Sequence, residues 1–203
     1  MSDPIDSALR QFVMLKLANL DERFRILDDG TIILSDTQAW MTLYDQLMRS
    51  PDITKHWSVV WIKSADDWQD EKGQQCLAAN FAAVRRGMKL RRLLIIADQL
   101  WPKADHLPHE SILRWVQDQN RQGINLDLAR ESEVNQESDL VAEMSVYGDR
   151  AIESKEFDNK LQTMRLVLSF DSDKIQAAMA RWNRLKSYAV SYWTLLDQLE
   201  IKE

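Results

Sequence analysis

The sequence has few cysteines, glycines and prolines, and it has no long apolar run. Its one cysteine, Cys76, cannot form an internal disulfide, which favours a reducing compartment such as the cytosol. Five glycines and four prolines leave few positions for unusual turns or long loops. No stretch reaches the roughly 18 apolar residues that a membrane-spanning helix needs. The N-terminal segment MSDPIDSALR contains acidic residues and is not expected to be a secretory signal.

Basic residues are outnumbered by acidic ones, which argues against a general nucleic-acid-binding surface. The chain has 26 Lys and Arg against 32 Asp and Glu, a net charge of -6, whereas nucleic-acid-binding domains usually have a basic face. The three histidines and Cys76 do not stand at zinc-ligand spacing. No glycine-rich phosphate loop or Gly-x-Ser-x-Gly motif is found. We therefore expect no metal and no cofactor.

What the sequence does contain is a regular alternation of apolar runs and helical patterns from residue 57 onward. Strands are predicted at 58–62, 90–97, 124–129, 140–147, 151–157 and 164–170. Helices are predicted at 70–86 and 111–122, with a long closing helix over 172–199, and 130–138 is predicted to be a loop. This order predicts an α/β fold with a mixed, mostly parallel sheet flanked by helices.

Residues 1–50 are interpreted as an N-terminal extension that packs on a main domain of residues 51–203. An aspartate-glycine turn between two short apolar runs is typical of a β-hairpin. The elements predicted in the extension are an amphipathic helix over 4–20, a hairpin over 24–34, and a helix from Ser35 or Asp36 to Arg49.

The densest group of basic residues lies at one junction between a helix and a strand. Gly87 is expected to end the helix and turn the chain into the strand. Cations in the last helical turn suit the negative end of the helix dipole, so much of this charge has a structural explanation. The alternative is a binding site for an anion or a partner. The candidate residues are Arg85, Arg86, Lys89, Arg91 and Arg92.

A pocket near the end of the first central strand is a second candidate site. Open α/β sheets bind ligands beyond the carboxyl ends of their strands. Packing of large aromatic side chains in the core is the alternative explanation. The residues that would line this pocket are Trp61, Trp68, Tyr147 and Asp149.

The turn Arg86-Gly87-Met88-Lys89-Leu90-Arg91 resembles the helix-to-strand turn of phospholipase D-like domains. A second glycine turn at Gly123, the segment 140–152 and a helix after Phe170 follow in the same order. Residues 179–186 resemble the final helix of single-copy members that act as sensory halves of bacterial regulators. The resemblance covers residues 57–190 and implies the fold. It also implies a homodimer, because single-copy members pair two halves.

The enzymes of that superfamily use a His-x-Lys-x4-Asp motif, in which the histidine is the nucleophile or general acid and the lysine holds the phosphate. None of the three histidines has this lysine: the residues found two positions later are Ser58 after His56, Pro108 after His106 and Ser111 after His109. Where the motif would fall, the sequence has Ala142, Met144 and Asp149. The resemblance therefore implies the fold without the phosphodiester chemistry.

Together these features predict a non-catalytic, cytosolic regulatory or adaptor protein that recognises a protein or a small anion. A protein partner and a homodimer are expected, with the N-terminal helix and Trp182 and Trp193 of the closing helix as contact surfaces. Two alternatives stay open. A nucleic-acid-binding module would use the basic cluster and depend steeply on salt. An enzyme would use an unrecognised phosphate-ester-type site, with a cleft of convergent titratable groups.

Overall fold

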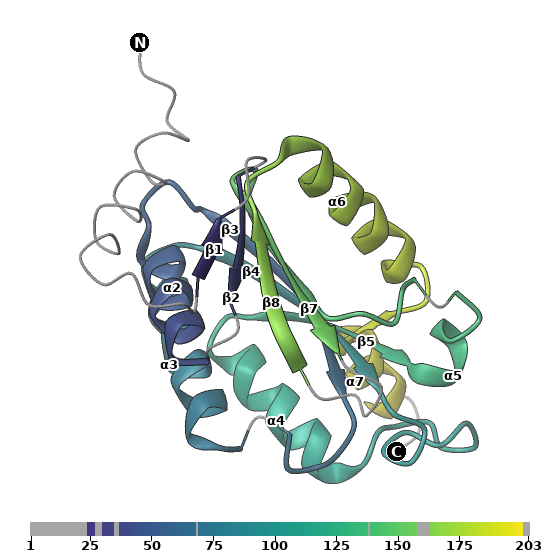
Figure 1. The fold of residues 1–203 in the computed structure, drawn as a ribbon. Coiled ribbons are helices and arrows are strands. Elements are labelled where there is room, and N and C mark those ends of the chain that lie inside the picture. The colour runs from purple at the N-terminus through teal and green to yellow at the C-terminus, as the bar shows by residue number, and fades with distance from the viewer. Residues whose placement is uncertain are drawn as a thin grey trace.

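The described residues form a single nine-stranded sheet with helices on both faces (Figure 1). The computed structural model describes residues 24–26, 30–34, 37–67, 69–137, 139–157 and 163–200. The helix predicted over 4–20 and the side chain of Trp68 lie outside these residues. In the part of the chain that is described, no helix is both long and apolar enough to span a bilayer.

The strands are β1 (Phe24–Ile26), β2 (Thr31–Leu34), β3 (Lys55–Ile62), β4 (Lys89–Ile96), β5 (Asn125–Arg130), β6 (Met144–Tyr147), β7 (Ala151–Phe157), β8 (Thr163–Ser169) and β9 (Val190–Ser191). The helices are α2 (Thr37–Arg49), α3 (Glu71–Arg85), α4 (Glu110–Arg121), α5 (Glu131–Val134), α6 (Ser172–Lys186) and α7 (Tyr192–Glu200). The strand order across the sheet is β1-β2-β8-β7-β6-β3-β4-β5-β9.

The sheet is mixed, and its parallel part is confined to β3, β4 and β5. Among the described strands, two of the eight pairings are parallel, β3 with β4 and β4 with β5. A mixed α/β sheet flanked by helices is confirmed, whereas the expectation that most of it is parallel is wrong. The reason is the connections: α3 and α4 cross over between parallel strands, but the short turn at Gly148 joins β6 to β7 as an antiparallel hairpin.

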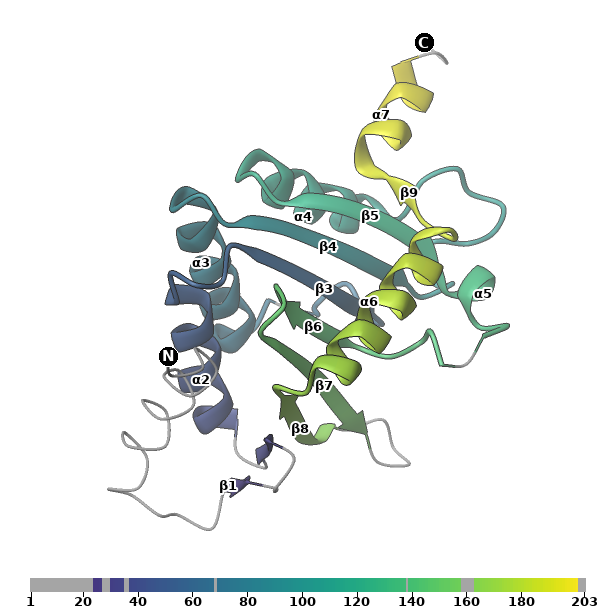
Figure 2. The same cartoon turned by 90° about the horizontal axis from the view of Figure 1, so that it is seen from above.

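The helices give the sheet two different faces. On one, which we call the three-helix face, α2, α3 and α4 pack; on the other, the α6 face, α6 packs (Figures 1 and 2). Side chains alternate between faces along a strand. In β3 and β4 the even-numbered residues point to the three-helix face and the odd-numbered residues to the α6 face.

The described part of residues 1–50 is continuous with this sheet. β1 pairs with β2 as the predicted hairpin, and β2 pairs with β8 so that Ile32 lies beside Leu168. α2 packs against α3 on the three-helix face. Residues far apart in the chain thus complete one core, and α2 becomes part of its cover.

Four predicted elements differ from the structure. β3 begins at Lys55 rather than at residue 58, and β6 begins only at Met144. The segment predicted as a loop over 130–138 contains the short helix α5. The closing helix is interrupted, because α6 ends at Lys186 and β9 then pairs with β5 before α7 begins. Trp182, expected at a contact surface, is a residue of α6 and its side chain is buried against the sheet.

The glycine junction between α3 and β4 forms as predicted. Asp70 caps the start of α3 by accepting a hydrogen bond from the Gly73 amide at 2.7 Å. Gly87 follows the end of α3 with φ of 94°, a conformation that favours glycine. The chain then enters β4, which places Arg91 and Arg92 on opposite faces of the sheet.

Candidate functional site

A row of polar side chains crosses the middle of the sheet on the three-helix face. The strand register places Arg92 of β4 beside Ser58 of β3, and Ser58 beside Ser145 of β6. Ser145 in turn lies beside Glu153 of β7. Leucines on β5 and β8 flank the row. Four neighbouring strands therefore place polar groups in a layer that is otherwise apolar, where each buried polar atom needs a partner.

His56 lies next to this row and has no hydrogen-bond partner. Its side chain is 1% exposed and stacks on the ring of Tyr147, with ring centroids 4.8 Å apart. Tyr44 of α2 meets the imidazole edge-on at 6.4 Å. Among the described residues, neither Nδ1 nor Nε2 finds a donor or acceptor. Burial, followed by the charge of Arg92, lowers the pKa of His56 to about 3, so the ring is neutral near pH 7.

Arg92 brings a positive charge into the same layer. Its side chain is 2% exposed, and its Nε donates to Ser58 Oγ at 3.2 Å. Its Nη1 donates to Oε1 of Gln119 on α4. Burial is the main influence on the pKa of Arg92 and lowers it. A guanidinium nevertheless stays protonated in proteins, so this charge is permanent.

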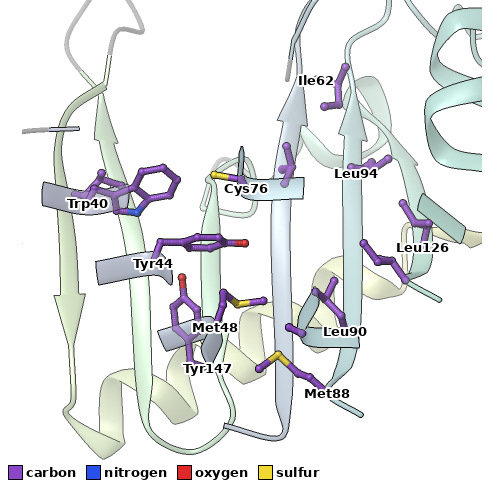
Figure 3. Packing of buried hydrophobic residues seen from close by; sticks show 14 of the residues in the cluster. Trp40, Tyr44, Met48, Ile62, Cys76, Met88, Leu90, Leu94, Leu126 and Tyr147 are labelled. Atoms are coloured by element: carbon purple, nitrogen blue, oxygen red, sulfur yellow. The ribbon is translucent and has the colours of Figure 1, made fainter. Parts of the chain in front are cut away.

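Side chains from α2 and α3, including Trp40, Tyr44 and Cys76, pack over the strands on the three-helix face (Figure 3). The Tyr44 hydroxyl donates to Asn80 Oδ1, whereas Asn80 Nδ2 has no partner among the described residues. Cys76 contacts the sulfur of Met41 at 3.7 Å. Burial raises the pKa of the Cys76 thiol to about 12, which keeps it protonated and a poor nucleophile.

The carboxylates at the other end of the row already accept hydrogen bonds. Glu153 accepts from the Tyr147 hydroxyl at 2.7 Å, and burial raises the pKa of Glu153. Glu143 accepts from the Lys155 ammonium and from the Trp61 amide, the latter at 3.3 Å. The acidic end is therefore internally paired, unlike the end that contains His56.

These groups enclose a cavity of about 30 Å³, which we call the polar chamber. Its lining includes Trp40, Tyr44, His56, Ser58, Arg92 and Glu153. The volume exceeds the 10–15 Å³ or so that one water needs but is far too small for a coenzyme. Within the described ranges, no group of three His, Cys, Asp or Glu side chains is placed to hold a metal ion. The chamber can accept a small polar species.

The predicted basic cluster is split between the two faces and the surface. Arg92 is in the polar chamber, whereas Arg91 on the α6 face pairs with Asp127 at 3.4 Å. Arg85 and Lys89 are exposed at the ends of α3 and β4. The strand period separates neighbouring arginines, so the five residues do not form one site.

Arg86 has a structural contact. Its side chain is exposed overall, but its Nη2 donates to the carbonyl of Met48 at the end of α2. It lines two surface hollows of about 540 Å³ and about 290 Å³ that flank the ends of α2 and α3. Anion binding by Arg85, Arg86 and Lys89 stays a prediction.

The second predicted pocket is not assembled from its four residues. Trp61 belongs to the α6 face, with Lys63 Nζ 4.1 Å from its ring centroid. Tyr147 lies in the layer of the polar chamber, and Asp149 is exposed in the turn between β6 and β7. Trp68 is outside the described residues. The structure thus joins Tyr147 to a different group of residues.

Sequence reasoning missed most of the chamber, although a signal was available. Ser58 stands two residues before Val60 and His56 stands four before it, so both share a face with apolar core residues. The same period assigns Arg92 to that face. Asn80 and Gln119 give no comparable signal, because polar residues are common on helices.

Comparison with known proteins identifies the fold. No protein-family model matches the sequence, and no curated protein matches it. TrmBL2, an archaeal chromatin protein, superposes with a TM-score of 0.52 at 11% identity, over 91% of this chain and 61% of that one. Polyphosphate kinase from Porphyromonas gingivalis gives 0.51 at 12% identity, over 77% of this chain and 23% of that one. NucT from Helicobacter pylori gives 0.50 at 9% identity, over 80% and 98%.

This chain spans less than two thirds of the length of TrmBL2 and of polyphosphate kinase. At such low identity the likeness establishes the fold alone. The protein shares a mixed α/β fold, with a sheet flanked by helices, with these solved structures.

Proposed function

We propose that the protein is a non-catalytic, cytosolic regulatory or adaptor module, and that the polar chamber is its recognition site for a small ligand. The observation that supports this most directly is His56, which is buried and neutral and whose two ring nitrogens find no partner in the part of the chain that is described. Native cores seldom leave such groups unpaired, because each one costs stability. A ligand that forms a hydrogen bond with His56 beside Arg92 would explain why these two polar residues are present in the core.

The residues that stand where the phospholipase D motif would fall support recognition rather than catalysis. Met144 is 3% exposed and packs with Val59 and Trp182 in the apolar cluster of the α6 face; it also borders the chamber, where a thioether cannot hold a phosphate as a lysine would. Ala142 precedes β6, and Asp149 is exposed. The low pKa of His56 also makes it a poor general acid or base near pH 7. No described group therefore stands ready for phosphodiester cleavage.

Two measurements test this function. Purified protein is assayed with bis(p-nitrophenyl) phosphate, and its thermal unfolding is followed against small anions and neutral polar solutes, with His56→Phe in parallel. We expect no turnover, and saturable stabilisation of the wild type that His56→Phe lacks. Turnover that is lost in a His56 or His109 variant would show an enzyme. Equal responses of wild type and His56→Phe to every compound would remove the chamber as the site.

A protein partner, including a second copy of the chain, is part of this proposal. Trp193 is 59% exposed on α7, where Tyr192 and Leu195 beside it are buried. A large exposed apolar side chain of this kind is typical of contact sites. Light scattering is expected to report a dimer that Trp193→Ala weakens. A wild-type monomer that captures no partner in affinity purification would contradict this part.

A nucleic-acid-binding function is the second candidate, supported by one feature. Lys55 and Lys89 are register neighbours at the start of β3 and β4, and they are exposed together with Arg85 and Arg86. TrmBL2 is described as binding DNA. DNA binding that falls steeply with salt, and is lost in Arg86→Glu, would favour this candidate. A DNA affinity that does not change with salt concentration, or no DNA binding, would count against this candidate.

A further inference from the structure

We propose that the polar chamber binds a small neutral amide, a molecule that carries a hydrogen-bond acceptor and a hydrogen-bond donor on different atoms. The inference rests on the proposed function, because it names the ligand class of the same site. Formamide is the smallest molecule of this class and is the probe in the test below.

The first argument is the pair of ring nitrogens on His56. The side chain is 1% exposed and lines the chamber, and neither Nδ1 nor Nε2 finds a partner among the described residues. A neutral imidazole has one N–H donor and one acceptor nitrogen, and its proton can occupy either position. A ligand that has both a donor and an acceptor can therefore pair with either tautomer. A ligand that only accepts hydrogen bonds can pair with one of them.

The second argument is the balance of charge around the chamber. Two basic residues, Arg92 and Lys155, line it together with two acidic residues, Glu143 and Glu153. These groups already interact within the protein. Lys155 pairs with Glu143, Glu153 accepts from the Tyr147 hydroxyl at 2.7 Å, and Arg92 is hydrogen-bonded as well. An ion that enters a buried site is costly unless an opposite charge compensates it, so the balanced lining favours a neutral ligand.

The third argument is the direction of polarity along the chamber. The strand register places Arg92 and Ser58 toward one end of the polar row and Glu153 toward the other. Guanidinium and hydroxyl groups donate at the first end, and carboxyl oxygens accept at the second. An amide matches both ends when its carbonyl oxygen faces Ser58 and its N–H groups face the carboxyl groups. A dipolar molecule is thus better suited to the chamber than one that only donates or only accepts.

The fourth argument is size. The chamber measures about 30 Å³, and Val59, Val60 and Met144 give it apolar walls as well. This volume is roughly two to three times the space that one water needs, so it suits a molecule of about three non-hydrogen atoms. A single water would leave the apolar walls without contacts, whereas the C–H group of a small amide can touch them.

Binding at this place connects the sheet to its helical cover. His56 and Ser58 belong to β3, while Tyr44 of α2 contacts the imidazole and holds Asn80 of α3. A ligand that orders His56 and Ser58 stabilises the packing of α2 and α3 on the sheet. Occupancy of the chamber is then measured as a change in the stability of this layer.

The test is thermal unfolding of the full chain with four solutes of equal heavy-atom number, at constant ionic strength. Formamide has a donor and an acceptor on different atoms, ethanol has both on one oxygen, acetonitrile only accepts, and formate only accepts and is charged. Ligands of this size bind no tighter than about 0.5 mM, so each solute is titrated to about 50 mM. We expect a saturable rise of a few degrees in Tm with formamide, a smaller rise with ethanol, and none with acetonitrile or formate.

Variants and a second readout locate the binding. His56→Phe and Ser58→Ala are expected to lose the response to formamide, whereas Arg85→Gln, which removes an exposed arginine, keeps it. Nitrogen NMR of protein labelled in its histidine rings needs no variant, so the test remains valid if a chamber variant fails to fold. Formamide should shift the ring signals of His56 and leave those of the exposed His106 and His109 in place.

The outcomes separate the inference from the proposed function. Equal responses to formamide in wild type and His56→Phe, unchanged His56 signals, or an equal rise with acetonitrile or formate would overturn the amide site. If ethanol, acetonitrile or formate distinguishes wild type from the variants and formamide does not, the amide inference fails and recognition in the chamber stands. If no solute distinguishes them, both fail.

Discussion

The two faces of the same strands differ in chemistry although they share one backbone. Val59, Leu93 and Met144 point to the α6 face and pack in an apolar cluster under Trp182. Their neighbours along the strands point to the three-helix face and include Ser58, Arg92 and Ser145 of the polar row. Apolar packing is sufficient to hold a helix on this sheet, as the α6 face shows. The polar groups on the opposite face therefore call for a reason other than stability.

The largest change in stability is expected when a charge is placed on the apolar α6 face. Met144→Lys is expected to lower the free energy of unfolding by about 3–5 kcal/mol, because a buried ammonium finds no partner there. Met144→Leu, the volume-conserving control, should cost less than about 1.5 kcal/mol. Urea unfolding measures both. If the two variants have the same stability, the α6 face is not the closed apolar layer described above.

A smaller loss is expected on the three-helix face when one hydrogen bond is removed. Tyr44→Phe leaves Asn80 Oδ1 buried without its donor and should cost about 1–3 kcal/mol. Tyr188→Phe removes the hydroxyl bonded to Glu137 at a more exposed position and should cost less than about 1 kcal/mol. Denaturant unfolding compares the two. The reverse ranking would mean that the Tyr44–Asn80 contact is dispensable.

A stabilising substitution is expected at His56. At pH 7, His56→Phe should raise the free energy of unfolding by about 1–2 kcal/mol. The change removes the two ring nitrogens that find no partner among the described residues and keeps an aromatic ring against Tyr147. Guanidinium unfolding provides the value. A clear loss of stability in His56→Phe would indicate that the imidazole is satisfied without a ligand.

The pH dependence gives a related, finer test. The folded pKa of His56 is about 3 against 6.5 in the unfolded chain, so in this window the unfolded state binds the extra proton and stability falls as pH falls. The slope from this group is about 1.4 kcal/mol per pH unit. Wild type and His56→Phe have the same titratable groups around position 56, namely Tyr44, Arg92, Tyr147 and Glu153. The difference between their stability curves therefore reports His56. Wild type should therefore lose stability faster than His56→Phe below pH 6.5, and parallel curves would contradict this.

The sequence predicted the order of elements well, and it failed where distant residues meet. The glycine junctions and the strand-helix alternation are local patterns, so β4, α4 and β5 are found within one residue or so of their predicted ranges. The pairing of β2 with β8 and the break between α6 and α7 depend on contacts across the fold.

The candidate site shows the same limit. Arg92 was predicted as part of a surface cluster because it is adjacent to Arg91, yet alternation in β4 buries one and leaves the other half-exposed. His56 lies outside the strand predicted at 58–62. Only the register with β6 places it against Tyr147. Alternation along each strand places His56, Ser58 and Arg92 on one face, but only the pairing of β4, β3, β6 and β7 brings the chamber together.

The most direct measurement of the central claim is a crystal structure of the full chain, compared with that of His56→Phe. The account predicts electron density for a small polar ligand in the polar chamber, within hydrogen-bond distance of the His56 ring. This density should be absent from His56→Phe. A wild-type chamber that holds only water would contradict the claim.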